Sequence, residues 1–404
     1  MKPFWDLIEQ NLGAEFAEDR ELLADVRALS EAFTEGRGQL DQNYLEDPRL
    51  QAAYLAYFVP LNFEKVHMLI SSHSGVWPSE LDPKKPQRWV DFGSGPGTAT
   101  LAALAAYKNR YKKLTELPPV HIDLIDTQKG ALTLAEILVK EFAKKLGLVV
   151  QVSLHSKMPA GASQVYDLAL AANVLNELPA EEGIQARELL LQVWDATSGV
   201  MLVLEPGHRV SSQRLVRYRE RLLKSSPNDA KILGPCHHIL KCPVHRTKHW
   251  CHFSEPVTDG RLIDLNLRIF KDPRGWLKFS YLLVRRAPAI AWDEKTFRAI
   301  GDLHISGPKR MSIDLCRPNE KLAIVVPGNI PPELRANLVR GATVWLDDDR
   351  QVTARPLTKR EVKYLPPKRD RSESPDRDEK PRERTGTPPK SSKRKRPDKN
   401  KGKR

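Results

Sequence analysis

The sequence predicts an α/β fold built on a parallel sheet of the kind that binds nucleotides. Three observations predict it. A buried strand at residues 89–91 runs into a turn with three glycines and then into a helix-forming run at 98–107. Apolar strand segments then alternate with amphipathic helical segments as far as residue 223. A second strand ends at Asp126, 29 residues after Gly97, where an acid is placed to accept hydrogen bonds from ribose hydroxyls.

The glycine turn is the most informative segment of the chain. Glycine allows the backbone to turn tightly and to approach a ligand closely. The turn has the pattern Asp-x-Gly-x-Gly-x-Gly, which resembles the first motif of class I S-adenosylmethionine (SAM) methyltransferases, where the loop lies against the methionine end of the cofactor. The resemblance implies a SAM site made of Asp91, Gly93, Ser94, Gly95, Gly97 and Asp126.

The N-terminal part of the chain is expected to be helical. Apolar residues recur at helical spacing through residues 1–35, which predicts two helices before a break at residues 36–38. A further helix is expected at 47–70, with an interruption near Pro60. Tyr54 and Tyr57 lie on this segment, where core packing is the simple explanation and lining a cofactor or RNA face is the functional one.

The same periodicities assign the rest of the α/β region. Apolar, β-branched segments predict strands, and amphipathic segments predict helices. The strands are expected at 120–125, 149–154, 166–172 and 200–204, and the helices at 131–145, 184–194 and 211–223. The last of these helices carries Arg214, Arg217, Arg219 and Arg221, a stripe that we interpret as a solvated face, with RNA contact as the alternative.

The ends of two of these strands are the positions where catalytic or acceptor-side residues are expected. Asn173 directly follows the strand at 166–172 and is expected either to face the methionine moiety or to cap a helix. Glu205 follows the strand at 200–204 and is a candidate for the acceptor side. The Asn-Pro-Pro-Tyr type of motif found in aminomethyltransferases is absent, so no catalytic residue is assigned.

The C-terminal part is predicted to complete the sheet and then to form a separate β-rich module. Segments at 265–270 and 279–285 are expected to be the two closing strands, and short strands are expected at 303–305, 311–315, 322–326 and 342–346. The expected organisation is a helical region at 1–80, a methyltransferase-like domain at 81–290 with a cysteine-rich insertion at 234–256, a β-rich module at 291–360 and a disordered basic tail at 368–404.

The four cysteines indicate a metal site. Three of them, Cys236, Cys242 and Cys251, fall within 16 residues with spacings C-x5-C and C-x8-C, and Cys316 follows further on. Clustered cysteines in a reducing compartment bind metal more often than they form disulfides. Four thiolates can hold an iron–sulfur cluster or one zinc ion, and the neighbouring histidines also allow a Cys3His zinc site.

Charge and composition limit the possible compartments and partners. Net charge is +14, of which residues 368–404 contribute +9 (16 basic minus 7 acidic side chains), so this tail is expected to bind nucleic acid non-specifically. No apolar run approaches the roughly 20 residues of a membrane span, so no membrane association is expected. Six acids among residues 1–22 argue against a signal or transit peptide, so a cytoplasmic protein is expected. The expected oligomeric state is a monomer.

Several blocks of the sequence together resemble one family. They are Tyr44 to Tyr57, the glycine motif with Thr98 and Ala99, the segment 173–178 with Leu204 to Gly207, and the cysteine segments with Trp250-Cys251-His252-Phe253, Phe279 to Leu282 and Asp314-Leu315-Cys316. Over roughly residues 40–325 the chain is similar to the ribosomal small-subunit methyltransferase-like (Rsm-type) family, whose eukaryotic members are mitochondrial ribosome assembly factors.

The resemblance implies a function in translation. It implies a Rossmann-like class I methyltransferase fold that binds SAM, a 4Fe-4S cluster on Cys236, Cys242, Cys251 and Cys316, and action on the small ribosomal subunit or its rRNA. Two chemistries are consistent with this: rRNA methylation, or non-catalytic assembly of the subunit on a retained methyltransferase fold. A zinc-binding methyltransferase of small molecules is a third and less favoured alternative.

Overall fold

The fold is described from a computed structural model of the chain. It describes residues 2–35, 43–177, 183–236, 238–245, 247, 250–272, 275–288, 294–307, 310–318, 320–327, 331–346 and 352–355. The break expected at 36–38 and the tail at 368–404 lie outside these residues. Within the described ranges, every helix is too short or too polar to cross a bilayer.

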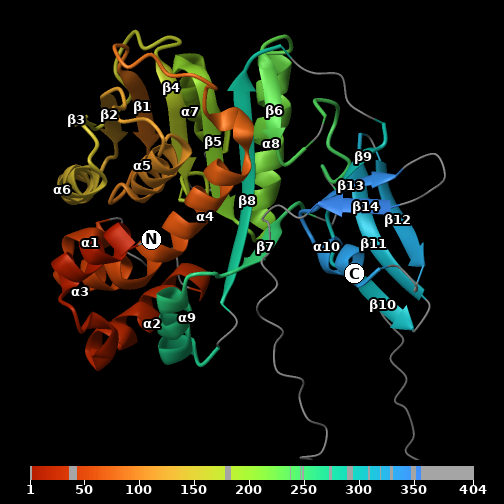
Figure 1. Cartoon of the computed structure of the whole chain (residues 1–404), viewed down its shortest axis with the longest axis horizontal. Helices are drawn as coiled ribbons and strands as arrows, with labels where there is room; N and C mark the ends of the chain where they lie inside the picture. The colour runs from red at the N-terminus through yellow and green to blue at the C-terminus, as the bar shows by residue number, and fades with distance from the viewer. Residues whose placement is uncertain are drawn as a thin grey trace, which may run out of the picture. The chain divides into compact units, whose positions relative to one another are not determined.

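A mixed eight-stranded sheet forms the centre of the molecule (Figure 1). Its strands lie in the order β3-β2-β1-β4-β5-β8-β6, with the short β7 also paired to β8. Strands β1 to β5 run parallel, whereas β8 is antiparallel to both β5 and β6. Their bounds are β1 (Gln87–Phe92), β2 (Val120–Ile125), β3 (Val150–His155), β4 (Tyr166–Ala172), β5 (Thr197–Pro206), β6 (Ala230–Gly234), β7 (Phe253–Pro256) and β8 (Trp276–Arg286).

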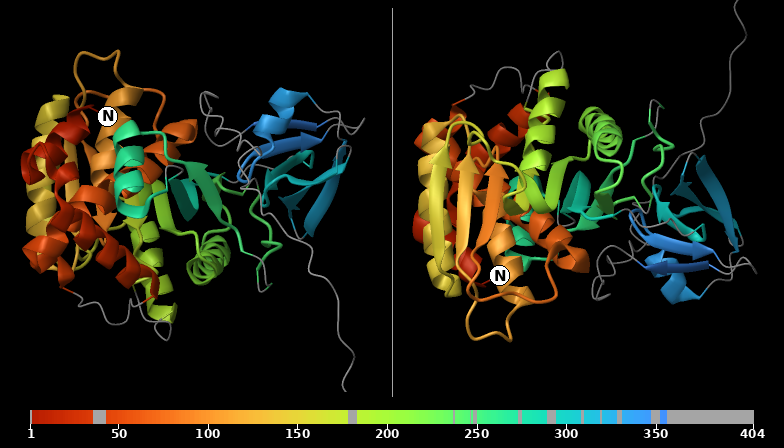
Figure 2. Two further views of the ribbon diagram at one scale, coloured as in Figure 1. Left: turned by 90° about the horizontal axis from the view of Figure 1, so that it is seen from below. Right: turned by 90° about the horizontal axis from the view of Figure 1, so that it is seen from above.

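Helices cover both faces of this sheet, as Figure 2 shows. Side chains alternate between the faces of a strand, so both faces of a central parallel strand must be apolar. Trp89 of β1 packs in one core, with α5 (Thr98–Arg110) and α6 (Lys129–Leu146), and its neighbour Val90 packs in the opposite core, with α7 (Gly183–Ala196) and α8 (Arg209–Ser225). The alternation seen in the sequence therefore corresponds to two buried layers.

The N-terminal helices extend the first of these cores. They are α1 (Lys2–Leu12), α2 (Arg20–Glu35), α3 (Pro48–Ala53) and α4 (Val59–Ser72). The interruption predicted near Pro60 is present as a π-helical stretch, η4 (Tyr54–Phe58), immediately before α4. Pro60 itself lies just after this stretch, at the start of α4, and a π-helical bulge is one way for a helix to accommodate the missing N–H of a proline.

The prediction of a closing strand at 265–270 is wrong, because this segment is the second half of helix α9 (Gly260–Phe270). The Asp259 carboxylate caps the helix by accepting hydrogen bonds from the N–H groups of Arg261 (3.0 Å) and Leu262 (3.2 Å). The alternation that indicated a strand includes Leu267, which is 47% exposed in the structure. The closing strands are instead β6, which the sequence analysis did not predict, and β8.

A second, antiparallel sheet follows in the C-terminal part of the chain. Its strands are β9 (Thr296–Ala299), β10 (His304–Gly307), β11 (Arg310–Arg317), β12 (Glu320–Pro327), β13 (Thr343–Leu346) and β14 (Val352–Arg355), with the short helix α10 (Pro332–Asn337). It has a small core of its own, which includes Phe297, Ile313 and Val344. The predicted fold class is thus confirmed: a Rossmann-like α/β sheet, preceded by helices and followed by a β-rich region.

Candidate functional site

The glycine turn joins β1 to α5 at the carboxyl end of the sheet. Gly93, Gly95 and Gly97 all have positive φ (67°, 50° and 78°), which explains why this turn requires glycine. A Cβ atom on Gly93 would lie 2.5 Å from a methyl group of Val174, and one on Gly97 would lie 3.1 Å from Val139. No atom lies within 4 Å of the corresponding position at Gly95, so Gly95 is the glycine whose backbone a ligand can approach.

Six of the seven predicted cofactor residues line one cavity beside this turn. Asp91, Gly93, Ser94 and Gly95 come from the end of β1 and its turn, Asp126 follows β2 and Asn173 follows β4. The seventh, Gly97, is not part of the lining and instead allows α5 and α6 to pack closely. Parallel strands that end at the same edge of a sheet bring these residues together, although they are far apart in sequence.

The two predicted acids among the lining residues have different environments. Asp91 is 1% exposed, and its Oδ2 accepts hydrogen bonds from the Thr100 N–H (3.1 Å) and hydroxyl (2.8 Å). Burial raises the pKa of Asp91 to about 7. Asp126 accepts from the N–H groups of Gly95 (2.8 Å) and Gln128 (2.9 Å), so it holds the glycine turn in place while it lines the cavity.

The segment after β4 forms another wall of the cavity. Asn173 has a positive φ of 62°, and its N–H donates to the carbonyl of Leu204 (2.7 Å). Among the described residues that follow it, 175–177 form a turn rather than a helix, so Asn173 caps no helix there. Glu205, the acceptor-side candidate, is fully buried and accepts a hydrogen bond from the N–H of Leu175 (2.8 Å), so its described contact supports the backbone of this segment.

The N-terminal helical region closes the cavity from a third side, which the sequence analysis gave only as the alternative to core packing for Tyr54 and Tyr57. Tyr54 lines the cavity, whereas Tyr57 is buried and donates to Oδ1 of Asn266 (2.7 Å). Tyr54 therefore lies on the cavity wall, and Tyr57 packs in the core. The predictions missed further lining residues: Tyr44, Asn62, Thr98, Gln128 and Glu177. Tyr44 belongs to a block that carries the family resemblance, and this was the one signal available for it.

The four cysteines line a second cavity, beside α8 and β8. Cys236, Cys242 and Cys251 belong to the loop between β6 and β7, and Cys316 is on β11 of the second sheet. Burial raises the pKa of Cys242 to about 12 and also raises the pKa values of Cys251 and Cys316, and neighbouring thiols add to each shift. In the described residues, no three metal-ligating side chains are close enough to form a preassembled single-ion site. The predicted ligands are thus gathered around one space, where a bound cation would favour the thiolate forms of Cys242, Cys251 and Cys316.

Arg219 is a residue of this second cavity that the sequence analysis interpreted wrongly. The arginine stripe on α8 is not a uniformly solvated face, because Arg219 is only 3% exposed. Its guanidinium donates to the carbonyls of His238 (2.7 Å) and Leu240 (3.1 Å) in the cysteine-bearing loop. His238 has its Nδ1 3.1 Å from the Leu240 carbonyl and is not among the cavity-lining residues. A buried cation therefore fixes this loop beside the thiols.

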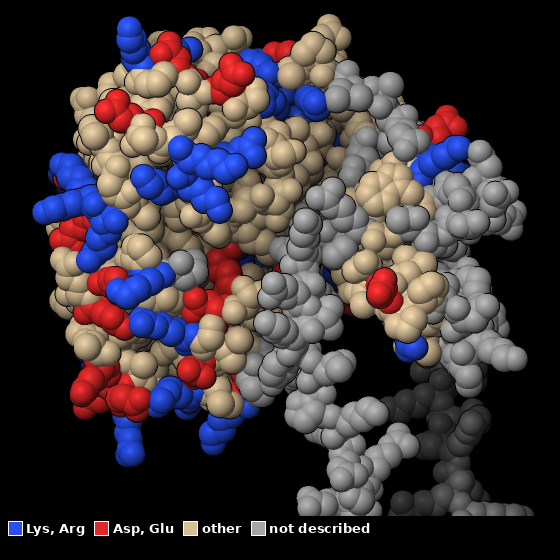
Figure 3. Space-filling model, viewed as in Figure 1, with Lys and Arg blue, Asp and Glu red and all other residues tan. Residues whose placement is uncertain are grey.

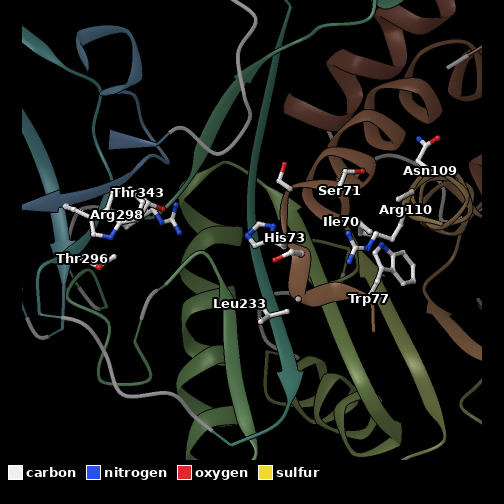
Figure 4. Close-up of a pocket in the computed structure, with 15 residues that line it drawn as sticks. Ile70, Ser71, His73, Trp77, Asn109, Arg110, Leu233, Thr296, Arg298 and Thr343 are labelled. Carbon is white, nitrogen blue, oxygen red and sulfur yellow. The ribbon is translucent and has the colours of Figure 1, made fainter. Parts of the chain in front are cut away.

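A wider cavity of about 810 Å³ lies between the end of α4 and the second sheet (Figure 4). Arg110 and Trp77 lie on one of its walls and Arg298 on the opposite wall, with His73 between them. Arg298 is engaged with the backbone, since it donates to the carbonyls of Pro235 (2.7 Å) and Gly341 (2.6 Å). On the face drawn in Figure 3, basic and acidic side chains are interspersed, so charge does not single out one binding surface there.

Fold and site together define a class: a Rossmann-like α/β protein of the methyltransferase type with a cysteine-rich segment beside its sheet. The chain matches, over residues 49–327, the family described as mitochondrial small ribosomal subunit Rsm22, and it belongs to that family. The human "Ribosome assembly protein METTL17, mitochondrial" is 27% identical over 178 residues, which cover 42% of this chain. This match spans 37% of the length of that relative.

Three solved methyltransferase structures resemble the chain at low identity. Loganic acid methyltransferase with SAH is 11% identical (TM-score 0.35) and covers 59% of this chain and 95% of its own. The human methyltransferase 10 domain containing protein is 12% identical (TM-score 0.32) and covers 66% of this chain and 96% of its own. The delta-N METTL16 MTase domain is 14% identical (TM-score 0.30) and covers 65% of this chain and 94% of its own. The fold assignment rests on the strand order rather than on these likenesses.

Family membership corrects the predicted location. The expectation of a cytoplasmic protein is wrong, because the family and the human relative are both described as mitochondrial. The findings point to mitochondria instead. The prediction failed because it relied on the acidic composition of residues 1–22, which is only an indirect indicator of the compartment.

Proposed function

We propose that this protein binds SAM and an iron–sulfur cluster, and that it acts on the mitochondrial small ribosomal subunit or its rRNA. The observation that carries the proposal is the cavity at the carboxyl end of the sheet. It joins the glycine turn to Asp126 and Asn173, which come from the ends of two further strands. Ligands of open α/β sheets bind at this edge.

The polar atoms of the cavity support a nucleoside cofactor. Several buried atoms have no hydrogen-bond partner among the described residues: Asp91 Oδ1, Ser94 Oγ, Thr98 Oγ1 and Gln128 Oε1. Buried polar atoms are normally satisfied, so these indicate a missing ligand. The cavity holds about 50 Å³, which is less than SAM requires, so some lining side chains must move when SAM enters. Asp126 would accept from the ribose hydroxyls, and Asp91 and the turn would contact the methionine end.

The four cysteines would hold the 4Fe-4S cluster. The donor set fits, because a 4Fe-4S cluster takes four thiolates. When bound, the cluster would link β11 to the loop that contains the other three cysteines. Its iron would keep the four cysteine ligands in their deprotonated, thiolate form. The loop with Cys236, Cys242 and Cys251, which Arg219 holds in place, would set the position of the cluster.

Metal analysis of the anaerobically purified protein tests this assignment. We expect about four irons and four sulfides per chain. A Cys316→Ser variant should lose much of the iron, whereas Ser312→Ala on the same strand, β11, should retain it. Zinc without iron or sulfide would instead support the zinc alternative.

Two activities are compatible with this site. As a methyltransferase, the protein would catalyse mainly by holding an rRNA acceptor close to the sulfonium methyl. As a non-catalytic assembly factor, it would use SAM and the cluster to maintain a subunit-binding conformation. One observation favours the second activity: the described contact of the acceptor-side candidate Glu205 is a structural hydrogen bond to Leu175. Methyl transfer to isolated subunits separates the two.

Small-subunit rRNA is the proposed partner, and a monomer is the proposed state. The human relative is named as a ribosome assembly protein, which supports a ribosomal partner for this chain. We also propose the division into regions 1–80, 81–290 and 291–360, with a nucleic-acid-binding tail at 368–404. Removing the tail should weaken binding to all RNA sequences alike and reduce its salt dependence; loss of binding to one RNA alone would contradict this.

A further inference from the structure

Lys65 is a buried cation without a counter-ion among the residues that the structure describes. It lies on α4 and is 9% exposed. Its Nζ donates one hydrogen bond, to Oδ1 of Asn62 (3.0 Å), and no ion pair joins it to a described carboxylate. Lysine is rarely buried to this extent unless it is paired, because an unpaired buried charge destabilises the fold.

The Lys65 ammonium group contacts a residue that lines the cofactor cavity, although Lys65 is not itself part of the lining. Asn62 and Val66, which are one turn apart on α4, both line that cavity. Because Nζ is within hydrogen-bond distance of Asn62, the ammonium group is one contact away from the space a ligand would occupy. Burial lowers the pKa of Lys65 to about 8, as expected for an ammonium group that has lost its water and gained no anion.

An unpaired anion lines the same cavity. Asp91 Oδ1 is buried without a partner among the described residues, whereas Oδ2 accepts both hydrogen bonds from Thr100. Asp91 and Lys65 form no ion pair with each other. A free carboxylate oxygen from the sheet therefore lines the cavity, and a free ammonium group from α4 lies directly behind Asn62, one of its lining residues. This pair of charges is complementary to the zwitterionic end of an α-amino acid.

We propose that Lys65 binds the α-carboxylate of the methionine moiety of SAM, and that Asp91 Oδ1 accepts from its α-amino group. The site thereby selects nucleosides that carry an amino acid over those that carry only a thioether. This inference rests on the proposed SAM site and adds a residue from the N-terminal helical region to it. Helix α4 becomes part of the binding site rather than only its cover.

Three nucleosides test the inference by isothermal titration calorimetry on the full chain. S-adenosylhomocysteine carries both charged groups, decarboxylated SAM keeps the amino group and lacks the carboxylate, and 5′-methylthioadenosine lacks both. In Lys65→Met the affinity for S-adenosylhomocysteine should fall about 10- to 100-fold, the usual range for losing a hydrogen bond to a charged group. Affinities for the other two nucleosides should stay within about twofold.

Two controls separate ligand binding from folding. Lys140→Met removes an exposed lysine on α6, paired with Glu136, and should leave all three affinities unchanged. The melting temperature of ligand-free Lys65→Met should equal or exceed that of the wild type, because an unpaired buried charge is removed.

Each outcome of the titration decides the question. Equal weakening of all three nucleosides by Lys65→Met, or no weakening of any, would overturn the role of Lys65 and leave the SAM site standing. If the wild type bound none of the three, the proposed SAM function would fail, and the Lys65 inference would fail with it.

Discussion

At the scale of single residues, the glycine turn assigns different functions to residues that look equivalent in the sequence. Gly95 faces open space, Gly93 meets Val174 and Gly97 meets α6. The sequence alone predicted a tight turn at these three glycines, because glycine readily adopts the positive φ that such a turn requires. It did not predict that Gly97 serves packing rather than ligand contact, because that depends on Val139 and Ala135 of a helix about 40 residues away.

Gly97→Ala should destabilise the protein more than Gly147→Ala. Both positions have positive φ (78° and 65°), so both substitutions cost about 1–2 kcal/mol of backbone strain. Only the Cβ at residue 97 also meets Val139 (3.1 Å) and Ala135 (3.3 Å), whereas the position at Gly147 is open. Overpacking adds about 1–3 kcal/mol. Urea unfolding measures the difference, and equal losses would show that α5 and α6 are not held at this separation.

At the scale of elements, the errors concern segments whose tertiary partners decide the structure. The run at 265–270 has a strand-like alternation, but together with the residues before it, it also has helical spacing. The residues at this spacing are buried in the structure: Leu262, Leu265, Asn266 and Ile269. The cap at Asp259 settles the choice in favour of the helix. Strand β6 pairs with β8 across about 50 residues, and such pairing is not visible in local sequence.

Asp259→Ala should cost more stability than Asp47→Ala, although both acids cap a helix. Losing the cap costs about 1 kcal/mol in each case. Asp259 also accepts a hydrogen bond from the indole N–H of Trp5 (3.0 Å), a residue that is 3% exposed. An unpaired buried donor costs roughly 1–3 kcal/mol more. Asp47 caps α3 through Arg49 in an exposed position. Thermal unfolding of the two variants tests this, and a smaller effect at Asp259 would contradict the described role of Trp5.

At the scale of the whole molecule, two links join the second sheet to the first. Arg298 of β9 donates to Pro235 beside the cysteine loop, and Cys316 of β11 lines the cysteine cavity. The sequence predicted the cysteines as a set, because their number and clustering indicate metal ligands. It did not predict Arg298 or Arg219, since an arginine that binds backbone carbonyls looks like any charged residue in the sequence.

If the proposed cluster is present, its removal should loosen the second sheet while the first sheet stays folded. Without metal, the cysteine cavity would keep Arg298 as its polar link, and metal-linked segments lose stability when the metal is removed. Limited proteolysis should therefore cut Cys316→Ser within residues 291–360 faster than it cuts the wild type. Equal cutting rates in iron-loaded wild type and Cys316→Ser would contradict a structural role of the cluster.

We propose that this chain brings SAM to the mitochondrial small ribosomal subunit. The most direct test loads the anaerobically purified protein with SAM that is tritiated at its methyl group. The loaded protein is incubated with small ribosomal subunits from cells that lack this protein, and the mixture is separated by sedimentation. We expect tritium in the small-subunit peak for the wild type and far less for Asp126→Ala. Label that remains in rRNA after phenol extraction would identify an enzyme, and label lost with the protein would identify an assembly factor. No tritium in the small-subunit peak would contradict the claim.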